Sequence, residues 1–415
     1  MTLRIADPEL FAVTAESVTL SFVIADAAGP TDAAARVLLD DVPRAVSNGP
    51  AGTRLVRIDG LAPDTEYALA IEAEGGARSE PGRYLPARVR TLAKPRGKRV
   101  ASFATLNDLH FGEPRFGGVM TEENEYGEAA PGFPLVRETD GDVPYWQLMN
   151  EDAVADINAA GVDAVVIKGD IADRGLRSQF EIAARTFERF DADWHAFLGN
   201  HDHYGLHAGV EVDGYALLGQ PRAPRAFDLG GWRLVLLDTV EPGDHHGVFP
   251  EDRLRWLERE LAGSCERAQP TLLLMHHQPV PPEHATSYPN SIGIIPEHST
   301  RIFDLLGRNP QVQGVLIGHT HRNRVRRYPA SGEIPFVEVN CVKDYPGGFA
   351  VYELYDDGTF RQEVRRTSTP RALAHSTRCR DFFKGGYRDF ALGTLAERCW
   401  AAGGTRASAR KSNFS

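Results

Sequence analysis

The chain has 415 residues, of which 42% are hydrophobic and 25% are charged, and its formal net charge at pH 7 is -11. This length predicts two domains, and no apolar run approaches the roughly 20 residues that a membrane-spanning helix needs. The acidic balance argues against a nucleic-acid polymer as partner, because such binding requires a basic face, but it leaves small phosphate esters as substrates. The first residues show no basic stretch followed by an apolar block, so we expect a cytoplasmic protein.

Through about residue 93, apolar and polar residues alternate in short runs, as in the run from Val18 to Ile24. This period of two predicts half-buried strands, and the Gly, Pro and Asp residues between the runs predict the turns of an antiparallel sandwich. The stretch 61–69, Leu-Ala-Pro-Asp-Thr-Glu-Tyr-Ala-Leu, resembles the tyrosine-corner region of fibronectin type III domains. The resemblance covers residues 1–93 and implies that the Tyr67 hydroxyl caps a backbone turn. Phe22 stands where that family usually has a core Trp.

A short basic stretch, residues 94–99, separates this pattern from a different one. Beyond it, strand-like apolar runs alternate with helix-like segments, and these runs are residues 103–106, 164–167, 194–198, 234–237, 272–275 and 315–317. One helix is expected to open with a capping box at Ser178–Glu181, and another is expected to end at Gly263. The alternation predicts an α/β layered core in which both sheet faces are covered.

Polar residues that can bind metal follow five of these runs directly. The five motifs are Asp108-Leu109-His110, Gly169-Asp170-Ile171-Ala172-Asp173-Arg174, Gly199-Asn200-His201-Asp202, His276-His277 and Gly318-His319-Thr320-His321. The carboxyl ends of strands in layered α/β proteins converge on one crevice, so distant segments can deliver ligands to one point. Alternate residues on an extended chain share a face, so Asp108 and His110 can approach one ion together. Each motif alone is a weak signal, and their order at strand ends is the strong one.

In this order the five motifs closely resemble the calcineurin-like metallophosphoesterase superfamily, over roughly residues 98–365. The resemblance implies a catalytic domain over residues 98–370, built as a layered β-sandwich flanked by helices. It also implies two neighbouring metal ions. Asp108, His110 and His321 would hold one ion, Asn200, His276 and His319 would hold the other, and Asp170 would bridge both. His201 would stabilise the transition state or protonate the leaving oxygen, and Asp202 would orient His201.

Two neighbouring ions suit phosphoryl transfer, because they can stabilise both the attacking and the leaving oxygen and can supply hydroxide near pH 7. Nitrogen and oxygen ligands without thiolate allow Mn, Fe or Zn. We prefer His276 to His277 as the lone metal histidine. Asp173 and Arg174 are interpreted as loop-bracing groups rather than ligands. His203 and His207 follow the third motif and could touch substrate.

Within the superfamily, the motifs are closest to the bacterial phosphodiesterases of cyclic nucleotides and small diesters. Purple acid phosphatases have a Tyr ligand where this chain has Asp173, and phosphoprotein phosphatases read G-N-H-E where it has Asp202. The expected activity is hydrolysis of 3',5'-cyclic nucleotides or other small phosphodiesters by a hydroxide that bridges the metals. A phosphomonoesterase related to acid phosphatases is the nearer alternative. A non-catalytic, metal-stabilised binding module is the alternative of a different class.

Two segments fall outside this resemblance. Residues 113–145 form a long acidic insertion, which is either a substrate-facing flap or a solvated excursion. Residues 371–415 form a C-terminal extension whose aromatic residues would be costly to expose, so we expect it to pack on the catalytic domain or on a second subunit. A flexible tail is expected from Ala401 onward.

Three further expectations concern partners, thiols and domain independence. The N-terminal domain or the C-terminal extension could dock a protein partner or a second copy of the chain. The cysteines are expected to be free thiols, with a Cys379–Cys399 bridge as the alternative. Because every expected ligand lies after Arg99, a shortened chain that begins near Lys94 is expected to keep the metal site.

Overall fold

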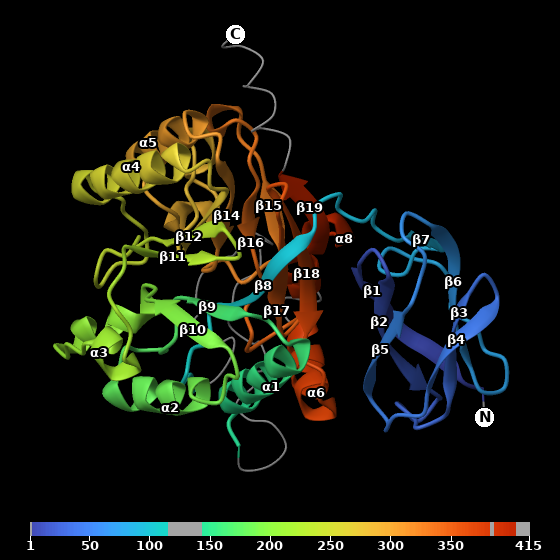
Figure 1. Cartoon of the computed structure of the whole chain (residues 1–415). Coiled ribbons are helices and arrows are strands. Elements are labelled where there is room, and N and C mark those ends of the chain that lie inside the picture. The colour runs from blue at the N-terminus through green and yellow to red at the C-terminus, as the bar shows by residue number, and fades with distance from the viewer. Residues whose placement is uncertain (1, 115–142, 382–385, 404–415) are drawn as a thin grey trace, which may run out of the picture.

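The computed structural model describes residues 2–114, 143–381 and 386–403. Its N-terminal strands form two antiparallel sheets, which lie at one side of the molecule (Figure 1). The first sheet has the order β1 (Arg4–Val13), β2 (Ser17–Ala25), β5 (Thr53–Asp59), and the second has the order β4 (Val42–Ser47), β3 (Ala35–Leu39), β6 (Glu66–Ala73), β7 (Arg88–Arg90). We call these seven strands the N-terminal sandwich, and they agree with the antiparallel arrangement that the alternation predicts.

Apolar side chains from both sheets form the core of the N-terminal sandwich, including Phe22 of β2 and Ile71 of β6. The predicted cap on a backbone turn is confirmed, because the Tyr67 hydroxyl accepts a hydrogen bond from the backbone nitrogen of Ala62 at 3.0 Å. One expectation is wrong: every residue of β2 is buried, not only every second one. The reason is a second contact on the polar face of β2, where Ser21 Oγ accepts a hydrogen bond from Arg366 at 3.2 Å.

After β7, the described residues form two six-stranded sheets, which we call the main sandwich, and the helices that flank them. The first has the order β10 (Asp193–Phe197), β9 (Ala164–Lys168), β8 (Arg99–Leu106), β17 (Gly348–Tyr355), β18 (Thr359–Arg366), β19 (Cys399–Gly403). The second has the order β11 (Arg225–Leu229), β12 (Trp232–Leu236), β13 (Thr271–Met275), β14 (Val312–Ile317), β16 (Phe336–Glu338), β15 (Arg324–Arg326). All six apolar runs named above mark strands of these sheets, with Leu198 and Leu237 one residue beyond the ends of β10 and β12.

Helices cover the outer faces of the main sandwich (Figure 1). Helices α1 (Tyr145–Ala160) and α2 (Arg177–Phe187) lie beside β9 and β10, whereas α4 (Glu251–Glu266) and α5 (Pro296–Gly307) lie beside β12 and β14. Alternation along β13 explains the layering. Leu272 and Leu274 join the core between the sheets, whereas Leu273 and Met275 pack in the cluster that contains side chains of α4 and α5. Both faces of this sheet are therefore covered, as predicted.

Two predicted helix ends differ from the structure. Helix α2 begins at Arg177 after the N-cap Leu176, so the capping box at Ser178–Glu181 is wrong. The side chain of Gln179 satisfies the backbone instead, because its Oε1 accepts hydrogen bonds from the nitrogens of Leu176 and Arg174. Helix α4 runs past Gly263 to Glu266, because Ser264 continues its buried face.

The C-terminal extension adds α6 (Pro370–Arg380), α7 (Gly386–Leu392), α8 (Leu395–Arg398) and β19. Tyr387 and Phe390 are buried in the main core, so the extension packs on the main sandwich as expected. Residues 401–403 pair within β19 rather than beginning a tail. Residues 404–415, Phe382 and Phe383, and residues 115–142 of the acidic insertion lie outside the described residues.

The remaining elements are short: η1 (His201–Ala208), α3 (Gly214–Leu218), η2 (Pro282–His284), η3 (Asn290–Ile292) and η4 (Pro329–Ser331). The four cysteines are free, so Cys379 and Cys399 form no bridge in this structure. Across the described ranges, none of the helices combines the length and the apolar character that crossing a membrane would require.

Candidate metal centre

The predicted ligands sit on loops that leave five strands at the same edge of the main sandwich. Strands β8, β9 and β10 run parallel in one sheet, and β13 and β14 run parallel in the other. Because the carboxyl ends of parallel strands meet at one edge, the five following loops converge. The predicted ligands on these loops are Asp108, His110, Asp170, Asn200, His276, His319 and His321, and the structure brings all seven into one cluster of neighbours.

Asp108, His110 and His321 form the first group, in which the nearest ligand atoms all lie within 4.8 Å of one another. His321 Nε2 is 3.4 Å from Asp108 Oδ1. The imidazole rings of His110 and His321 meet edge to face, with their centroids 5.3 Å apart. These three side chains can therefore surround one ion.

Asp170 lies between the two sides of the cluster. Its Oδ2 is 3.9 Å from His110 Nε2 and 3.2 Å from His276 Nε2. His276 Nε2 is in turn 3.1 Å from Asn200 Oδ1. The other oxygen of the carboxylate, Oδ1, accepts a hydrogen bond from the backbone nitrogen of His201 at 2.9 Å. One carboxylate thus faces a histidine from each predicted ligand set.

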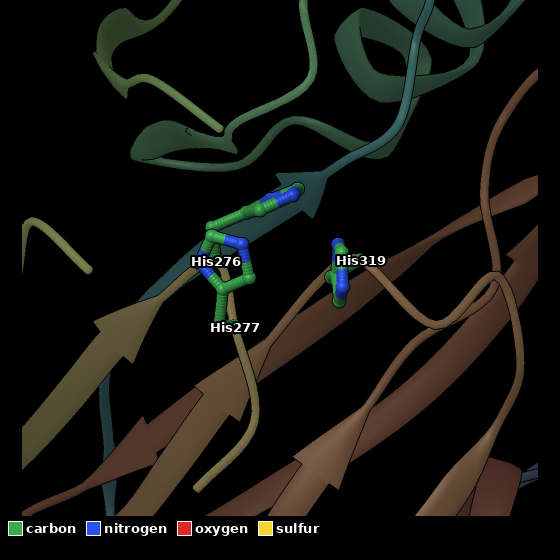
Figure 2. A group of neighbouring side chains, drawn as sticks. All are labelled: His276, His277 and His319. Carbon is green, nitrogen blue, oxygen red and sulfur yellow. The ribbon is translucent and has the colours of Figure 1, made fainter. Parts of the chain in front are cut away.

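Figure 2 shows how His276, His277 and His319 gather from the ends of β13 and β14. His276 and His277, which directly follow β13, differ in their contacts, because successive side chains of an extended segment point to opposite sides. His276 reaches Asp170 and Asn200, whereas the Nδ1 of His277 lies 2.9 Å from the Thr239 hydroxyl. This difference supports His276 as the ligand.

Each of the four predicted histidine ligands has one ring nitrogen on an oxygen atom of the protein. His276 Nδ1 donates to the Lys168 carbonyl at 2.7 Å and His319 Nε2 to the Ile292 carbonyl at 3.1 Å, while His110 Nδ1 and His321 Nδ1 lie 3.4 Å from Asp173 Oδ1 and Asp344 Oδ2. Such outer partners fix the tautomer and the orientation of metal-binding histidines. The remaining nitrogen of each ring is the one left for an ion.

The residues present fit a metal. His110 Nε2 is buried and has no hydrogen-bond partner in the described part of the chain, which is costly unless an ion uses it. The backbone also accepts strain here, since Asp108, His110, Asp170, His319 and His321 all have positive φ between 45° and 69°. Left-handed non-glycine residues are uncommon and cluster at functional sites.

Two glycines allow the loops to approach this closely. A Cβ added at Gly199 would lie 2.3 Å from Asp170 Oδ1, and one added at Gly169 would lie 2.6 Å from His276 Nδ1. Real Cβ atoms do not come that near to another atom. The glycines of the second and third motifs therefore make room for the ligands.

Electrostatics sets the protonation states of the site before any ion binds. Burial raises the pKa of Asp170, but the neighbouring His276 and other histidines bring it well below its ordinary value. Burial, reinforced by His276, lowers the pKa of His319 to about 3. His276 is the opposite case: burial lowers its pKa, yet Asp170 raises it to a net value of about 9. A metal ion that binds His276 through Nε2 would displace any proton carried there.

His201 is held by Asp173 and not by Asp202. His201 Nδ1 donates to the backbone carbonyl of Asp173 at 2.9 Å and lies 3.8 Å from its Oδ1. The Asp202 carboxylate instead accepts hydrogen bonds from the backbone nitrogens of Ala172 (2.7 Å), Gly199 (2.8 Å) and Ile171 (3.2 Å). The expectation that Asp202 orients His201 is therefore wrong. Asp202 ties the loop after β9 to the loop after β10.

Replacing Asp202 by Ala should accordingly cost stability. We expect the apparent free energy of unfolding of the metal-free protein, measured with urea, to fall by about 2–3 kcal/mol, because three buried backbone N–H groups lose their acceptor. Asp213 is the matched control. It caps α3 at an exposed position through Ala216 N, so Asp213→Ala should cost only about 1 kcal/mol. An unfolding free energy unchanged by Asp202→Ala would contradict the bracing role.

The remaining motif residues lie around this cluster. Arg174 is exposed and pairs with Asp173 at 3.5 Å, in keeping with a loop-bracing role. His203 lines a pocket beside η1 together with Arg222. His207 Nε2 bonds the Gly243 carbonyl at 2.7 Å.

The sequence analysis missed two side chains that position metal ligands. Tyr204 accepts a hydrogen bond from Asn200 Nδ2 at 2.6 Å, which leaves the amide oxygen of Asn200 turned toward His276. Asp344 is fully buried and faces His321. It lies in the loop after β16, a strand that runs parallel to β14, but several residues beyond the strand end, so a search limited to residues directly after apolar runs did not find it.

Comparison with known proteins agrees with this geometry. Residues 102–323 match the calcineurin-like phosphoesterase family. The chain is 30% identical over 224 residues to the 3',5'-cyclic adenosine monophosphate phosphodiesterase CpdA of Escherichia coli, a match that covers 50% of this chain and 76% of that protein. It is 26% identical over 214 residues to a probable cyclic nucleotide phosphodiesterase of a Synechococcus strain, with 50% and 78% covered.

Among solved structures, the chain is similar to a dimetal phosphatase from Danio rerio, with a TM-score of 0.46, 17% sequence identity, and 65% and 97% of the two chains covered. A likeness this distant bears on neither activity nor substrate.

Since the family match spans more than half of the 415 residues, the chain belongs to the calcineurin-like phosphoesterase family. It is a metal-dependent phosphoric ester hydrolase. The non-catalytic binding module considered above is therefore set aside.

Proposed function

We propose that this protein is a phosphodiesterase that hydrolyses 3',5'-cyclic nucleotides or other small phosphodiesters at a centre of two metal ions. The observation that carries the proposal is the position of Asp170, whose carboxylate faces His110 at 3.9 Å and His276 at 3.2 Å. A carboxylate with a histidine on each side is suited to bridge two ions. The cyclic nucleotide phosphodiesterases among its relatives support the choice of a diester.

In this proposal, Asp108, His110 and His321 hold one ion, Asn200, His276 and His319 hold the other, and Asp170 contacts both. The bound ions, which would be Mn, Fe or Zn, would neutralise phosphate charge and lower the pKa of water. Asp173 and Asp344 orient His110 and His321 through their Nδ1 atoms.

His201 is placed to act on the ester rather than on the metals. A carbonyl can only accept a hydrogen bond, so the Nδ1 of His201 carries the proton that it donates to Asp173 O. Its Nε2 is left for the substrate. In the imidazolium form, in which Nε2 also carries a proton, the ring can donate a hydrogen bond to a phosphoryl oxygen, or can protonate the leaving oxygen and return to the neutral form with its proton on Nδ1.

The test is hydrolysis of a panel by the metal-free protein reloaded with Mn²⁺, Fe²⁺ or Zn²⁺. The panel holds cyclic AMP, cyclic GMP, bis(p-nitrophenyl) phosphate and p-nitrophenyl phosphate. We expect kcat/KM for the diesters to exceed that for the monoester by at least tenfold with the best metal. A preference for p-nitrophenyl phosphate would favour the phosphomonoesterase alternative.

The domain assignment is part of the same proposal. We propose a fibronectin type III-like domain over residues 1–93, supported by the hydrogen bond from Ala62 to Tyr67, then a catalytic domain over 98–370 and an extension over 371–415. The cytoplasmic location and the docking of a protein partner or a second copy stay predictions.

A further inference from the structure

The N-terminal sandwich places one fully buried carboxylate, Glu9 of β1, against the main sandwich and the C-terminal extension. Glu9 Oε1 accepts a hydrogen bond from the Tyr345 hydroxyl at 2.7 Å and lies 2.7 Å from Arg388 Nη2. Its Oε2 accepts a hydrogen bond from Ser21 at 2.9 Å and lies 3.7 Å from Arg366 Nη1. Every partner except Ser21 belongs to the part of the chain after residue 340. Glu9 is thus the polar centre of the contact.

Two of these partners, Tyr345 and Arg388, are chain neighbours of residues at or beside the metal centre. Tyr345 follows Asp344, and Arg388 follows Tyr387 in α7. The Tyr387 side chain is hydrogen-bonded to Asp344, whose Oδ2 lies 3.4 Å from His321 Nδ1. Two paths therefore lead from β1 to the same carboxylate, one along the backbone and one through α7.

We propose that Glu9 is a positioning residue of the metal centre, through which the N-terminal sandwich fixes the Asp344 carboxylate that orients His321. The inference rests on the proposed two-metal centre. A carboxylate that holds a metal-binding histidine sets the direction of its ring, so moving Asp344 weakens the ion that His321 holds.

The other contacts of Asp344 do not fix its position alone. Cys341 donates to it at 2.7 Å and Lys343 Nζ is 3.4 Å away, and both belong to the same short segment that would move with it. This segment is itself held by Lys343, whose Nζ lies 3.0 Å from Glu113 and whose carbonyl accepts a hydrogen bond from His375 at 2.8 Å. On the side of the N-terminal sandwich, the contact of Tyr345 with Glu9 and the hydrogen bond from Tyr387 add a further anchor, so loss of Glu9 is expected to loosen Asp344 without releasing it.

A matched control is present in the same contact. Arg57 of β5 lies 2.5 Å from Glu363 of β18, so this ion pair also joins the N-terminal sandwich to the main sandwich. In the described part of the chain, the side chains of Arg57 and Glu363 bond Asp59, Arg365 and each other, and these bonds do not reach the metal loops. Arg57→Met breaks this ion pair without touching the paths to Asp344.

The experiment is calorimetric titration of the metal-free full-length protein with Mn²⁺. Glu9→Ala would leave two arginines buried without their counter-charge and risks unfolding the chain, so we use Glu9→Gln and Tyr345→Phe, which keep the shape of the side chains. Each should bind two ions, one of them about tenfold more weakly than wild type, the low end of the effect of losing an outer partner. Arg57→Met should match wild type, and Asp344→Asn should weaken the same ion.

The outcomes separate the two proposals. Wild-type protein that binds fewer than two ions overturns the two-metal centre and this inference with it. Two ions with unchanged affinities in folded Glu9→Gln and Tyr345→Phe overturn the inference alone. An equal weakening in Arg57→Met also overturns it, because any loosening of the two sandwiches would then suffice. A chain that begins near Lys94 lacks Glu9, so we expect it to bind the ion held by His321 more weakly than the full-length protein does.

Discussion

Replacing Asp170 is expected to do the most damage to the centre. In Asp170→Asn the number of bound ions at saturation should fall from two to one or none, and turnover of a diester should fall by roughly 10²–10³-fold or more, at least the effect of removing one key electrostatic group. The reason is charge. The pKa of this buried carboxyl lies well below its ordinary value, so the group is ionised throughout the assay range, and asparagine keeps its shape without the negative charge.

Metal content measured by elemental analysis, together with steady-state kinetics, checks this result. The control is Asp213→Ala, which removes an exposed carboxylate that caps α3 outside the ligand loops and should keep both ions. Asp170→Asn with two ions and normal turnover would show that another group bridges the metals.

The strands and the residues at their ends could be predicted because the signal is local. A buried strand such as β9 needs a short apolar run, and Asp170 two residues beyond its end marks the edge where parallel strands converge. Once the end of β13 is known, period-two alternation also predicts that His276 and His277 face opposite sides, so that only one of the two can face the other ligands. For these positions, chain order and strand geometry are sufficient.

The role of Asp202 could not be predicted in this way, because adjacency in the chain is not adjacency of side chains. His201 and Asp202 begin η1, a 3-10 helix with three residues per turn, so consecutive side chains point about 120° apart. His201 therefore faces His110, whose ring centroid is 4.4 Å away, while Asp202 turns to the backbone of the loop after β9.

Contacts between segments far apart in the chain could not be predicted from the sequence either. The alternating pattern predicts that the polar face of β2 is exposed to solvent. Ser21 on that face is nevertheless buried, because Glu9 and Arg366 both contact it. Nothing near Glu9 in the sequence indicates that Tyr345, more than 300 residues away, will bind it. The N-terminal strands were thus predictable as strands, and their connection to the metal centre was not.

Loss of His201 should act on chemistry and leave the metals in place. We expect His201→Ala to lower turnover by about 10²–10⁴-fold, the usual contribution of a positioned proton donor, while two ions remain bound. His207→Ala is the control. His207 lies on the same short helix, bonds the Gly243 carbonyl and stacks on the ring of Tyr204, and its loss should leave turnover near normal.

A series of aryl phosphodiesters with leaving groups of different pKa shows how His201 acts. If it protonates the leaving oxygen, the loss in His201→Ala should shrink as the leaving group improves, because a stable anion departs without a proton. Burial lowers the pKa of His201 below its ordinary value of 6.5, so its protonated fraction falls as pH rises through that pKa. Wild-type turnover of poor leaving groups should decline over that range, and the variant should lose this decline. A uniform loss across the series would assign His201 to the phosphoryl oxygens instead, and loss of an ion would make it a ligand.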